Sequence, residues 1–120
     1  MKGKTLCPVC EKYYFNEMGD YDICSNCGWE NDNVQYDDHD YWGGANDLSV
    51  NEAKVAYEIS LCEGQKNKLN ILQKEHNDSI TAIYSKYGDI DYRTIDGDSI
   101  RSEFKKEHDR YVKELERLNN

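Results

Sequence analysis

Apolar residues in the second half of the chain recur every three or four positions, which is the spacing of one face of an α-helix. The first such stretch ends before Gly88. Its apolar stripe, which includes one histidine, comprises Leu69, Leu72, His76, Ile80, Ile83 and Tyr87. The second stretch follows Asp98 and Ser99, either of which can cap a helix. Its stripe comprises Ile100, Phe104, Tyr111, Leu115 and Leu118. We expect two amphipathic helices packed as an antiparallel hairpin, with residues 88–97 as the turn.

Polar residues interrupt both stripes. Glu107 and His108 occupy positions in the second stripe where core residues are expected, and His76 lies on the first stripe. The two histidines would either meet across the helical hairpin or pack there partly exposed, and we favour partial exposure.

A third helix is predicted earlier in the chain by its cap. Ser49 followed by Glu52 is the capping-box pattern, in which each side chain accepts a hydrogen bond from the backbone N–H of the other residue. The apolar residues near it lie at helical spacing and are Val50, Val55, Ala56, Ile59 and Cys62. We expect a helix over about residues 50–63, ending before Gly64. Because no Lys, Arg or His flanks Cys62, we expect it to be a buried, inert thiol.

The first third of the chain has a different pattern. Two short aromatic or apolar runs, residues 13–15 and 21–23, flank a turn that contains Gly19 and Asp20. This pattern predicts a β-hairpin. Residues 31–47 are polar, acidic and contain glycines, without a helical or strand period, so we expect an ordered loop there.

Four cysteines stand in two Cys-x-x-Cys motifs, Cys7 with Cys10 and Cys24 with Cys27, one motif at each end of the expected hairpin. Such a turn lets two thiolates converge on one ion, and four thiolates satisfy the tetrahedral preference of Zn²⁺. We therefore predict one structural zinc ion bound by these four residues. An iron site of rubredoxin type uses the same four sulfurs, so the spacing does not separate the two metals. Redox-active dithiols are a third alternative.

The predicted fold class is α+β, with a small N-terminal zinc-ribbon-like β-hairpin followed by three α-helices, the last two as an antiparallel helical hairpin. We expect two parts. Residues 1–64 form a metal-binding domain with the acidic loop and the first helix, and residues 65–120 form the helical hairpin.

The charge of the chain is concentrated in its first half. The formal net charge is −9, and residues 1–64 carry all of it, with four lysines, no arginine and 13 acidic residues. Such a surface repels phosphates, so we expect no nucleic-acid partner. We find neither a signal-peptide pattern nor a run apolar enough to span a membrane. We therefore expect a cytoplasmic protein without a membrane partner.

Several linked motifs resemble those of the bacterial cysteine-rich CPCC family. They are Cys7-Pro8-Val9-Cys10, the segment from Tyr21 to Asp32 and the segment from Asp37 to Ala53. The chain departs from the family pattern at Val9, where the family has a further cysteine, and at Glu11, where it has glycine. The resemblance implies a small bacterial cytosolic protein with a zinc-ribbon-like site and no established activity, and some relatives accompany toxin and immunity systems. The departure at Val9 implies that the outer pair of cysteines suffices for the metal.

Aromatic and acidic side chains gather around and after the second cysteine motif. One hypothesis is a recognition face for a basic partner, comprising Trp29, Glu30, Asp32, Asp37, Asp38, Asp40 and Tyr41. The alternative is a solvated loop that wraps the metal site, with Trp29 buried against the hairpin. His39 could contribute to a second metal site among these aspartates, although we favour a solvated loop. Gly43 and Gly44 indicate a backbone conformation or a close approach that other residues do not allow.

We expect no enzymatic activity, because four thiolates leave no open metal position and no catalytic motif is recognisable. The function expected is that of a zinc-stabilised protein that presents an acidic surface to a basic protein partner. One candidate partner is a toxin that the chain would neutralise as an immunity protein. The alternative class is a redox or iron-binding protein that uses the four-cysteine site directly.

Overall fold

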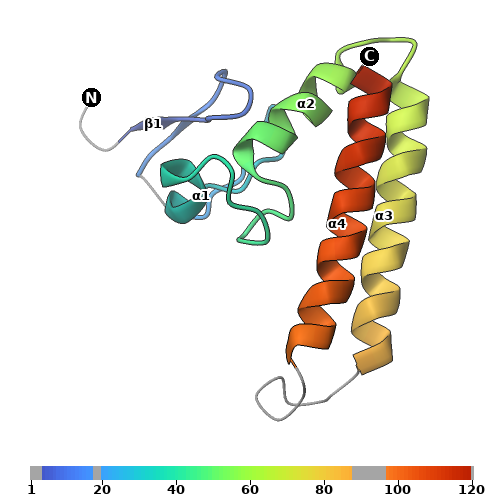
Figure 1. Cartoon of the computed structure of the whole chain (residues 1–120). Helices are drawn as coiled ribbons and strands as arrows, with labels where there is room; N and C mark the ends of the chain where they lie inside the picture. The colour runs from blue at the N-terminus through green and yellow to red at the C-terminus, as the bar shows by residue number, and fades with distance from the viewer. Residues whose placement is uncertain (1–3, 18–19, 88–96, 120) are drawn as a thin grey trace. The chain divides into compact units, whose positions relative to one another are not determined.

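The computed structural model describes residues 4–17, 20–87 and 97–119. The chain divides into two compact units, Met1–Leu61 and Cys62–Asn120. The elements are β1 (Thr5–Leu6), β2 (Tyr14–Phe15), α1 (Asn33–Asp37), α2 (Val50–Ser60), α3 (Lys66–Tyr87) and α4 (Gly97–Asn119) (Figure 1). The predicted α+β class, with a small N-terminal hairpin followed by helices, is confirmed.

The pairing of the N-terminal strands differs from the prediction. β1 pairs antiparallel with β2, with Thr5 opposite Phe15, and the first cysteine motif lies between them. Residues 21–23 pair instead with residues 30–31, where Ile23 lies opposite Glu30. The expected pairing of 13–15 with 21–23 is wrong because the chain reverses within each Cys-x-x-Cys turn, so each motif closes its own small hairpin. Of the turn expected at Gly19-Asp20, Gly19 lies outside the described residues.

The core of the first unit is small and rich in sulfur. Its buried members are Cys7, Val9, Cys10, Phe15, Cys24, Trp29 and Val50. Tyr13 packs on this cluster, with its ring edge-to-face on Phe15 at a centroid distance of 5.2 Å. Three of the seven buried residues are cysteines, so the apolar area available to stabilise the unit is limited.

The short helix α1 was not predicted, and residues 38–49 form an ordered loop against it. Asp32 caps the helix through Oδ1, which accepts hydrogen bonds from the N–H groups of Val34 at 2.8 Å and Gln35 at 3.4 Å. The fully buried Gln35 holds the loop, because its Nε2 lies 3.0 Å from three backbone oxygens. These are the carbonyl oxygens of Tyr41, Asn46 and Leu48.

The two glycines of this loop have the two roles expected of them. Gly43 has φ +80°, in the left-handed region, and open space where a Cβ would stand. At Gly44 a Cβ would lie 2.8 Å from Oδ2 of Asp32 and 3.0 Å from the side chain of Gln35. Gly43 therefore supplies a conformation and Gly44 supplies a close approach.

Helix α2 begins as predicted and ends earlier. The capping box is present in both directions, with Oγ of Ser49 accepting from the N–H of Glu52 at 3.1 Å and Oε1 of Glu52 accepting from the N–H of Ser49 at 2.9 Å. The helix ends at Ser60, with Leu61 as its C-cap, rather than near residue 63. Cys62 therefore lies beyond the helix and is exposed, which overturns its expected burial.

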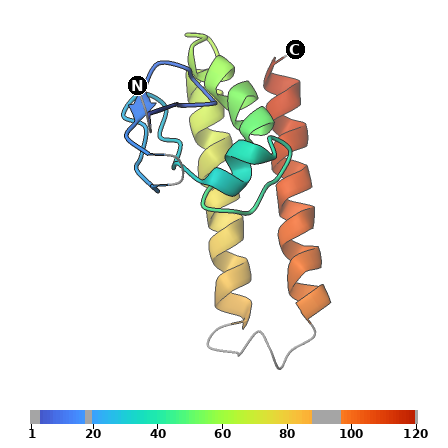
Figure 2. The ribbon, with the colours of Figure 1, turned by 90° about the vertical axis from the view of Figure 1, so that its left-hand side faces the viewer.

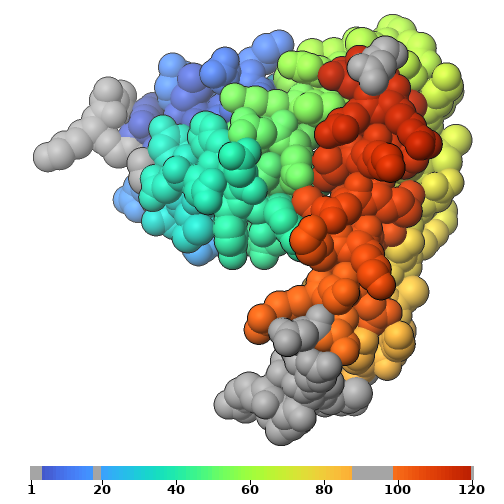
Figure 3. All heavy atoms as spheres, in the orientation of Figure 1, coloured from blue at the N-terminus to red at the C-terminus, as the bar shows by residue number. Residues whose placement is uncertain are grey.

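The second unit is the predicted antiparallel helical hairpin. α3 and α4 lie side by side in both ribbon views, and their side chains meet along the helices in the space-filling view (Figures 1, 2 and 3). Nε2 of Gln65 donates to the carbonyl oxygen of Leu118 at 3.0 Å and joins the two ends of the hairpin. The expected turn over 88–96 lies outside the described residues. α4 begins at Gly97, so the predicted caps Asp98 and Ser99 fall within its first turn.

The polar residues in the stripes are buried, which corrects the expected partial exposure of the histidines. His76 and His108 are both almost fully buried. Across the hairpin, Nδ1 of His76 lies 2.6 Å from Oε2 of Glu107, and the His76 ring stacks on Tyr111 with centroids 4.1 Å apart. Arg110 donates to both carboxylate oxygens of Glu107, at 2.8 and 2.7 Å. Within the described part of the chain, no helix combines the length and apolar content that crossing a bilayer requires.

Candidate metal centre

The two Cys-x-x-Cys motifs have the same backbone fold. In the first, the N–H of Cys7 donates to the carbonyl of Tyr13 at 2.8 Å and the N–H of Glu11 donates to the carbonyl of Cys7 at 3.0 Å. In the second, the N–H of Cys24 donates to the carbonyl of Trp29 at 2.8 Å and the N–H of Gly28 donates to the carbonyl of Cys24 at 2.9 Å. Each turn therefore directs its two cysteine side chains to the same side.

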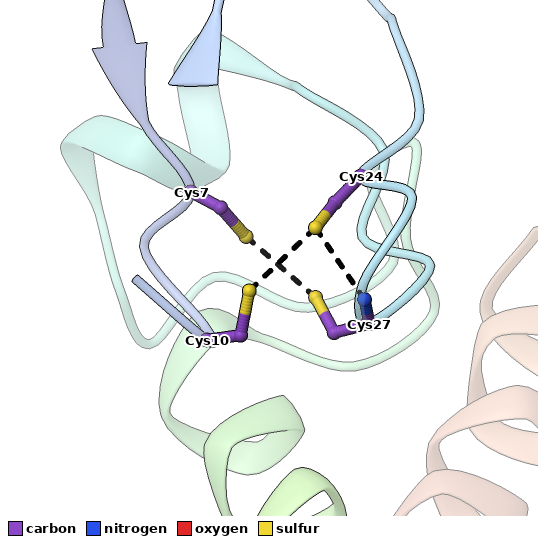
Figure 4. A group of neighbouring side chains, drawn as sticks. All are labelled: Cys7, Cys10, Cys24 and Cys27. Carbon is purple, nitrogen blue, oxygen red and sulfur yellow. Dashed lines mark hydrogen bonds between the residues drawn. The ribbon is translucent and has the colours of Figure 1, made fainter. Parts of the chain in front are cut away.

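The four cysteine side chains converge on one point, as Figure 4 shows. Their Sγ atoms all lie within 4.8 Å of one another. The distances across the two turns are 3.6 Å for Cys7 to Cys27 and 3.6 Å for Cys10 to Cys24, too long for disulfides, and all four are thiols. A tetrahedral zinc site with Zn–S bonds of about 2.3 Å needs sulfurs about 3.8 Å apart. The four cysteines could therefore bind a metal ion.

The thiols differ in their ease of ionisation. Burial raises the pKa of Cys7 and that of Cys27, because desolvation disfavours the charged thiolate. Burial also acts to raise the pKa of Cys10, but hydrogen bonds from the Asn26 side chain and the Lys12 backbone outweigh it and lower the pKa to about 7. Four thiolates so close together repel one another unless a cation lies between them. The site is therefore suited to a divalent metal ion.

Neighbouring groups hold the sulfurs in place. The N–H of Cys27 donates to Sγ of Cys24 at 3.4 Å. Nδ2 of Asn26 donates to the hydroxyl of Tyr57 at 3.0 Å, and this bond connects the second cysteine turn to α2. Such contacts orient metal ligands and tune their basicity. The sequence analysis did not find Asn26 and Tyr57, because no pattern in the sequence relates residues 31 positions apart.

Val9 shows how the third position of the first motif is used. Its side chain is buried in the core cluster with Phe15, Trp29 and Val50. The cysteines on either side of it supply the two sulfurs of this turn. At this position an apolar side chain of moderate size fills the core of the unit.

The residues proposed for a recognition face fall into two groups. Trp29 and Asp32 are buried, Trp29 in the core and Asp32 as the cap of α1, so neither presents a side chain to a partner. Glu30 is half-buried. The exposed members are Asp37, Asp38, Asp40 and Tyr41.

His39 is half-buried and stabilises the loop. Its carbonyl oxygen accepts a hydrogen bond from the N–H of Asn51 at 3.1 Å, and its ring packs edge-on against Tyr36. Among the described residues, the four cysteines are the one group of His, Cys, Asp or Glu side chains drawn together closely enough to hold a metal ion.

Comparison with known proteins gives one match. The family model described as "Cysteine-rich CPCC" matches residues 5–78, which include both cysteine motifs, the acidic loop, α2 and the first part of α3. A search of curated proteins gave no match. The match extends 20 residues beyond the region in which the motifs were recognised, which ended near residue 58.

Proposed function

The chain belongs to the cysteine-rich CPCC family, and from that premise we propose that it is a non-catalytic, zinc-stabilised protein whose acidic N-terminal unit binds a basic protein. The observation that carries the zinc-binding part is the convergence of four Sγ atoms within 4.8 Å of one another. Cys7, Cys10, Cys24 and Cys27 would hold the ion, and zinc bound by four thiolates supplies a structural cross-link.

The small core supports a structural role for the metal. The first unit buries few large apolar side chains besides Phe15, Trp29 and Val50. Structural zinc contributes about 10–16 kcal/mol of binding free energy in small zinc-finger peptides, which is comparable to the stability of a whole domain. The ion would replace the missing core by joining two turns that are 14 residues apart in the sequence, from Cys10 to Cys24.

The absence of an open ligand position supports a non-catalytic role. Four cysteine sulfurs complete a tetrahedral coordination shell, whereas catalytic zinc sites keep one position for water or substrate. Cys7, Cys10 and Cys24 are buried and Cys27 is half-buried, so a substrate would reach the sulfurs poorly.

The charge of the first unit supports a basic partner. Residues 1–64 carry the whole formal charge of −9, and Asp37, Asp38 and Asp40 are exposed. Complementary charge accelerates encounter between proteins and penalises wrong partners. A toxin that acts on nucleic acid tends to be basic, and the partner class we propose is such a toxin, with this chain as its immunity protein in the bacterial cytoplasm.

Metal analysis and spectroscopy of the purified chain test this proposal. One zinc per chain without visible absorbance would support it. A visible absorbance that bleaches reversibly on reduction would favour the alternative, an iron protein that uses the four-cysteine site for redox chemistry. For the partner, the product of an adjacent reading frame that is basic should bind, and its affinity should fall steeply as salt is raised. An adjacent basic protein that fails to bind at low salt would contradict the immunity role.

A further inference from the structure

The short β-pair around the second cysteine turn has one unoccupied edge. The N–H of Asn31 donates to the carbonyl of Asp22, and the N–H of Cys24 donates to the carbonyl of Trp29, both at 2.8 Å. These two bonds flank the facing residues Ile23 and Glu30 and make them a non-hydrogen-bonded pair. The N–H and C=O of Ile23 therefore point away from its partner strand. Within the described part of the chain neither group makes a hydrogen bond.

The opposite edge of the same pair is closed. The N–H of Glu30 donates to Oδ1 of Asn46 at 2.8 Å, and the carbonyl of Glu30 accepts from Nδ2 of Asn46 at 2.7 Å. Asn46 thus occupies the place that a further strand would take beside Glu30. The contrast leaves the edge at Ile23 as the side on which the pair can be extended.

The side chains at the unoccupied edge are apolar and exposed. Ile23 and Tyr21 each expose 58% of their surface, although both residue types are commonly buried in strands. They lie two positions apart in an extended segment and therefore point to the same face. Glu30, directly opposite Ile23, shares that face. The edge thus combines free backbone groups, apolar contact area and nearby acidic charge.

Resting on the proposed function, in which the acidic unit binds a basic protein, we propose that this binding occurs by strand addition: an extended, basic segment of the partner pairs with the edge at Ile23. The backbone groups of Ile23 supply two hydrogen bonds, and Tyr21 and Ile23 contact apolar side chains of the added strand. Its lysines or arginines lie near Glu30, Asp20 and Asp22. This is the β-augmentation mode of peptide recognition.

Charge distinguishes this occupant from a second copy of the chain. Two copies paired at this edge would bring together two units that each carry −9, which opposes association at low salt. A Lys-rich strand removes that repulsion. A dimer that forms through Ile23 is therefore an outcome that would overturn the proposal.

Defined peptides test the binding mode on the intact, zinc-loaded chain. The probe is an acetylated and amidated peptide of alternating Lys and Val, (Lys-Val)4. One control peptide replaces Val by Gly, which keeps the charge but removes the preference for an extended strand. Another is N-methylated at the central Val residues, which removes backbone donors. We expect (Lys-Val)4 to bind about tenfold more tightly than either control, and the amide of Ile23 to become protected from hydrogen exchange.

Two matched variants locate the site. Ile23→Lys places a positive charge at the proposed edge, and Val34→Lys makes the same change at an exposed β-branched residue of α1 in the same unit. We expect Ile23→Lys to weaken binding of (Lys-Val)4 about tenfold and Val34→Lys to change it less than about twofold. Equal losses in the two variants, or equal binding of the Gly peptide, would overturn strand addition while leaving a basic partner in place. No binding of any basic peptide at low salt would overturn both proposals.

Discussion

Glu11 and Gly28 occupy equivalent positions, each directly after the second cysteine of a Cys-x-x-Cys turn. Each donates its N–H to the carbonyl of the first cysteine of its turn, at 3.0 Å for Glu11 and 2.9 Å for Gly28. Both have positive φ, +58° at Glu11 and +85° at Gly28. Glycine adopts this conformation without cost, whereas a residue with a Cβ loses about 1–2 kcal/mol there. The glutamate that departs from the family pattern therefore weakens the first turn.

We predict that Glu11→Gly stabilises the zinc-loaded protein by about 1 kcal/mol in urea unfolding. Glu11→Gln removes the charge but keeps the Cβ, and it should leave stability unchanged within about 0.5 kcal/mol. Gly28→Ala should destabilise by about 1 kcal/mol through conformation alone, because a Cβ there meets no atom within 4 Å. Equal effects of Glu11→Gly and Glu11→Gln would show that charge, not backbone conformation, governs this position.

Gly43 and Gly44 should respond differently to the same substitutions. Asn tolerates positive φ, so Gly43→Asn should cost less than Gly43→Ala, for which we expect a loss of about 1 kcal/mol. At Gly44 the obstacle is the side chain of Asp32, 2.8 Å from a built Cβ. Both Gly44→Ala and Gly44→Asn should therefore destabilise, by about 1–3 kcal/mol. Thermal unfolding of the four variants checks this, and rescue of Gly44 by Asn would contradict it.

Gln35→Glu should destabilise the first unit strongly. The substitution replaces a donor that lies 3.0 Å from three carbonyl oxygens with a carboxylate oxygen in a fully buried position. We expect a loss of about 3 kcal/mol or more in urea unfolding, because the carbonyls lose their donor and a charge is buried. Gln73→Glu adds the same charge at a half-buried position of α3 and is the control. Similar losses in the two variants would contradict the role given to Gln35.

The helical hairpin should lose stability in acid through Glu107. Burial acts to raise the pKa of Glu107, but hydrogen bonds from Arg110 and His76 outweigh it and hold the pKa below 4.5. The unfolded chain therefore takes up the proton first. Glu107 contributes stability above about pH 4.5, and that contribution disappears as the pH falls through the lower, folded-state pKa.

Urea unfolding of wild type and Glu107→Gln between pH 6 and pH 3 measures this contribution. We expect the variant to be less stable by about 1–3 kcal/mol at pH 6 and the difference to shrink toward pH 3. Comparing the two proteins cancels any loss of metal in acid, which affects both. Glu116→Gln, at an exposed position of α4, should show no such difference. A difference independent of pH would contradict the assignment.

The helices could be predicted because their signals are local. The capping box of Ser49 and Glu52 fixed the start of α2 within one residue, and the stripe from Leu69 to Tyr87 matches α3. The helix α1 was missed because it is only five residues long and buries a glutamine rather than an apolar stripe. The burial of His76 and Glu107 was missed because each satisfies the other across two helices, 31 residues apart.

The strand pairing could not be derived from the runs of apolar residues alone. Residues 13–15 and 21–23 are neighbours in sequence, which favours pairing them. The observed partners are instead set by the two cysteine turns, each of which reverses the chain. The four cysteines were identified from spacing, whereas the burial of Trp29 and Asp32 depends on Cys24 and the cap of α1, which spacing does not indicate.

Zinc content of single-cysteine variants, measured by native mass spectrometry with elemental analysis, tests the central claim most directly. Cys24→Ser removes one sulfur of the cluster, and Cys62→Ser removes the exposed cysteine outside it. We expect one zinc per chain in the wild type and in Cys62→Ser. Cys24→Ser should lose the ion and with it the folded first unit. Full retention of one zinc per chain by Cys24→Ser would contradict the four-cysteine site.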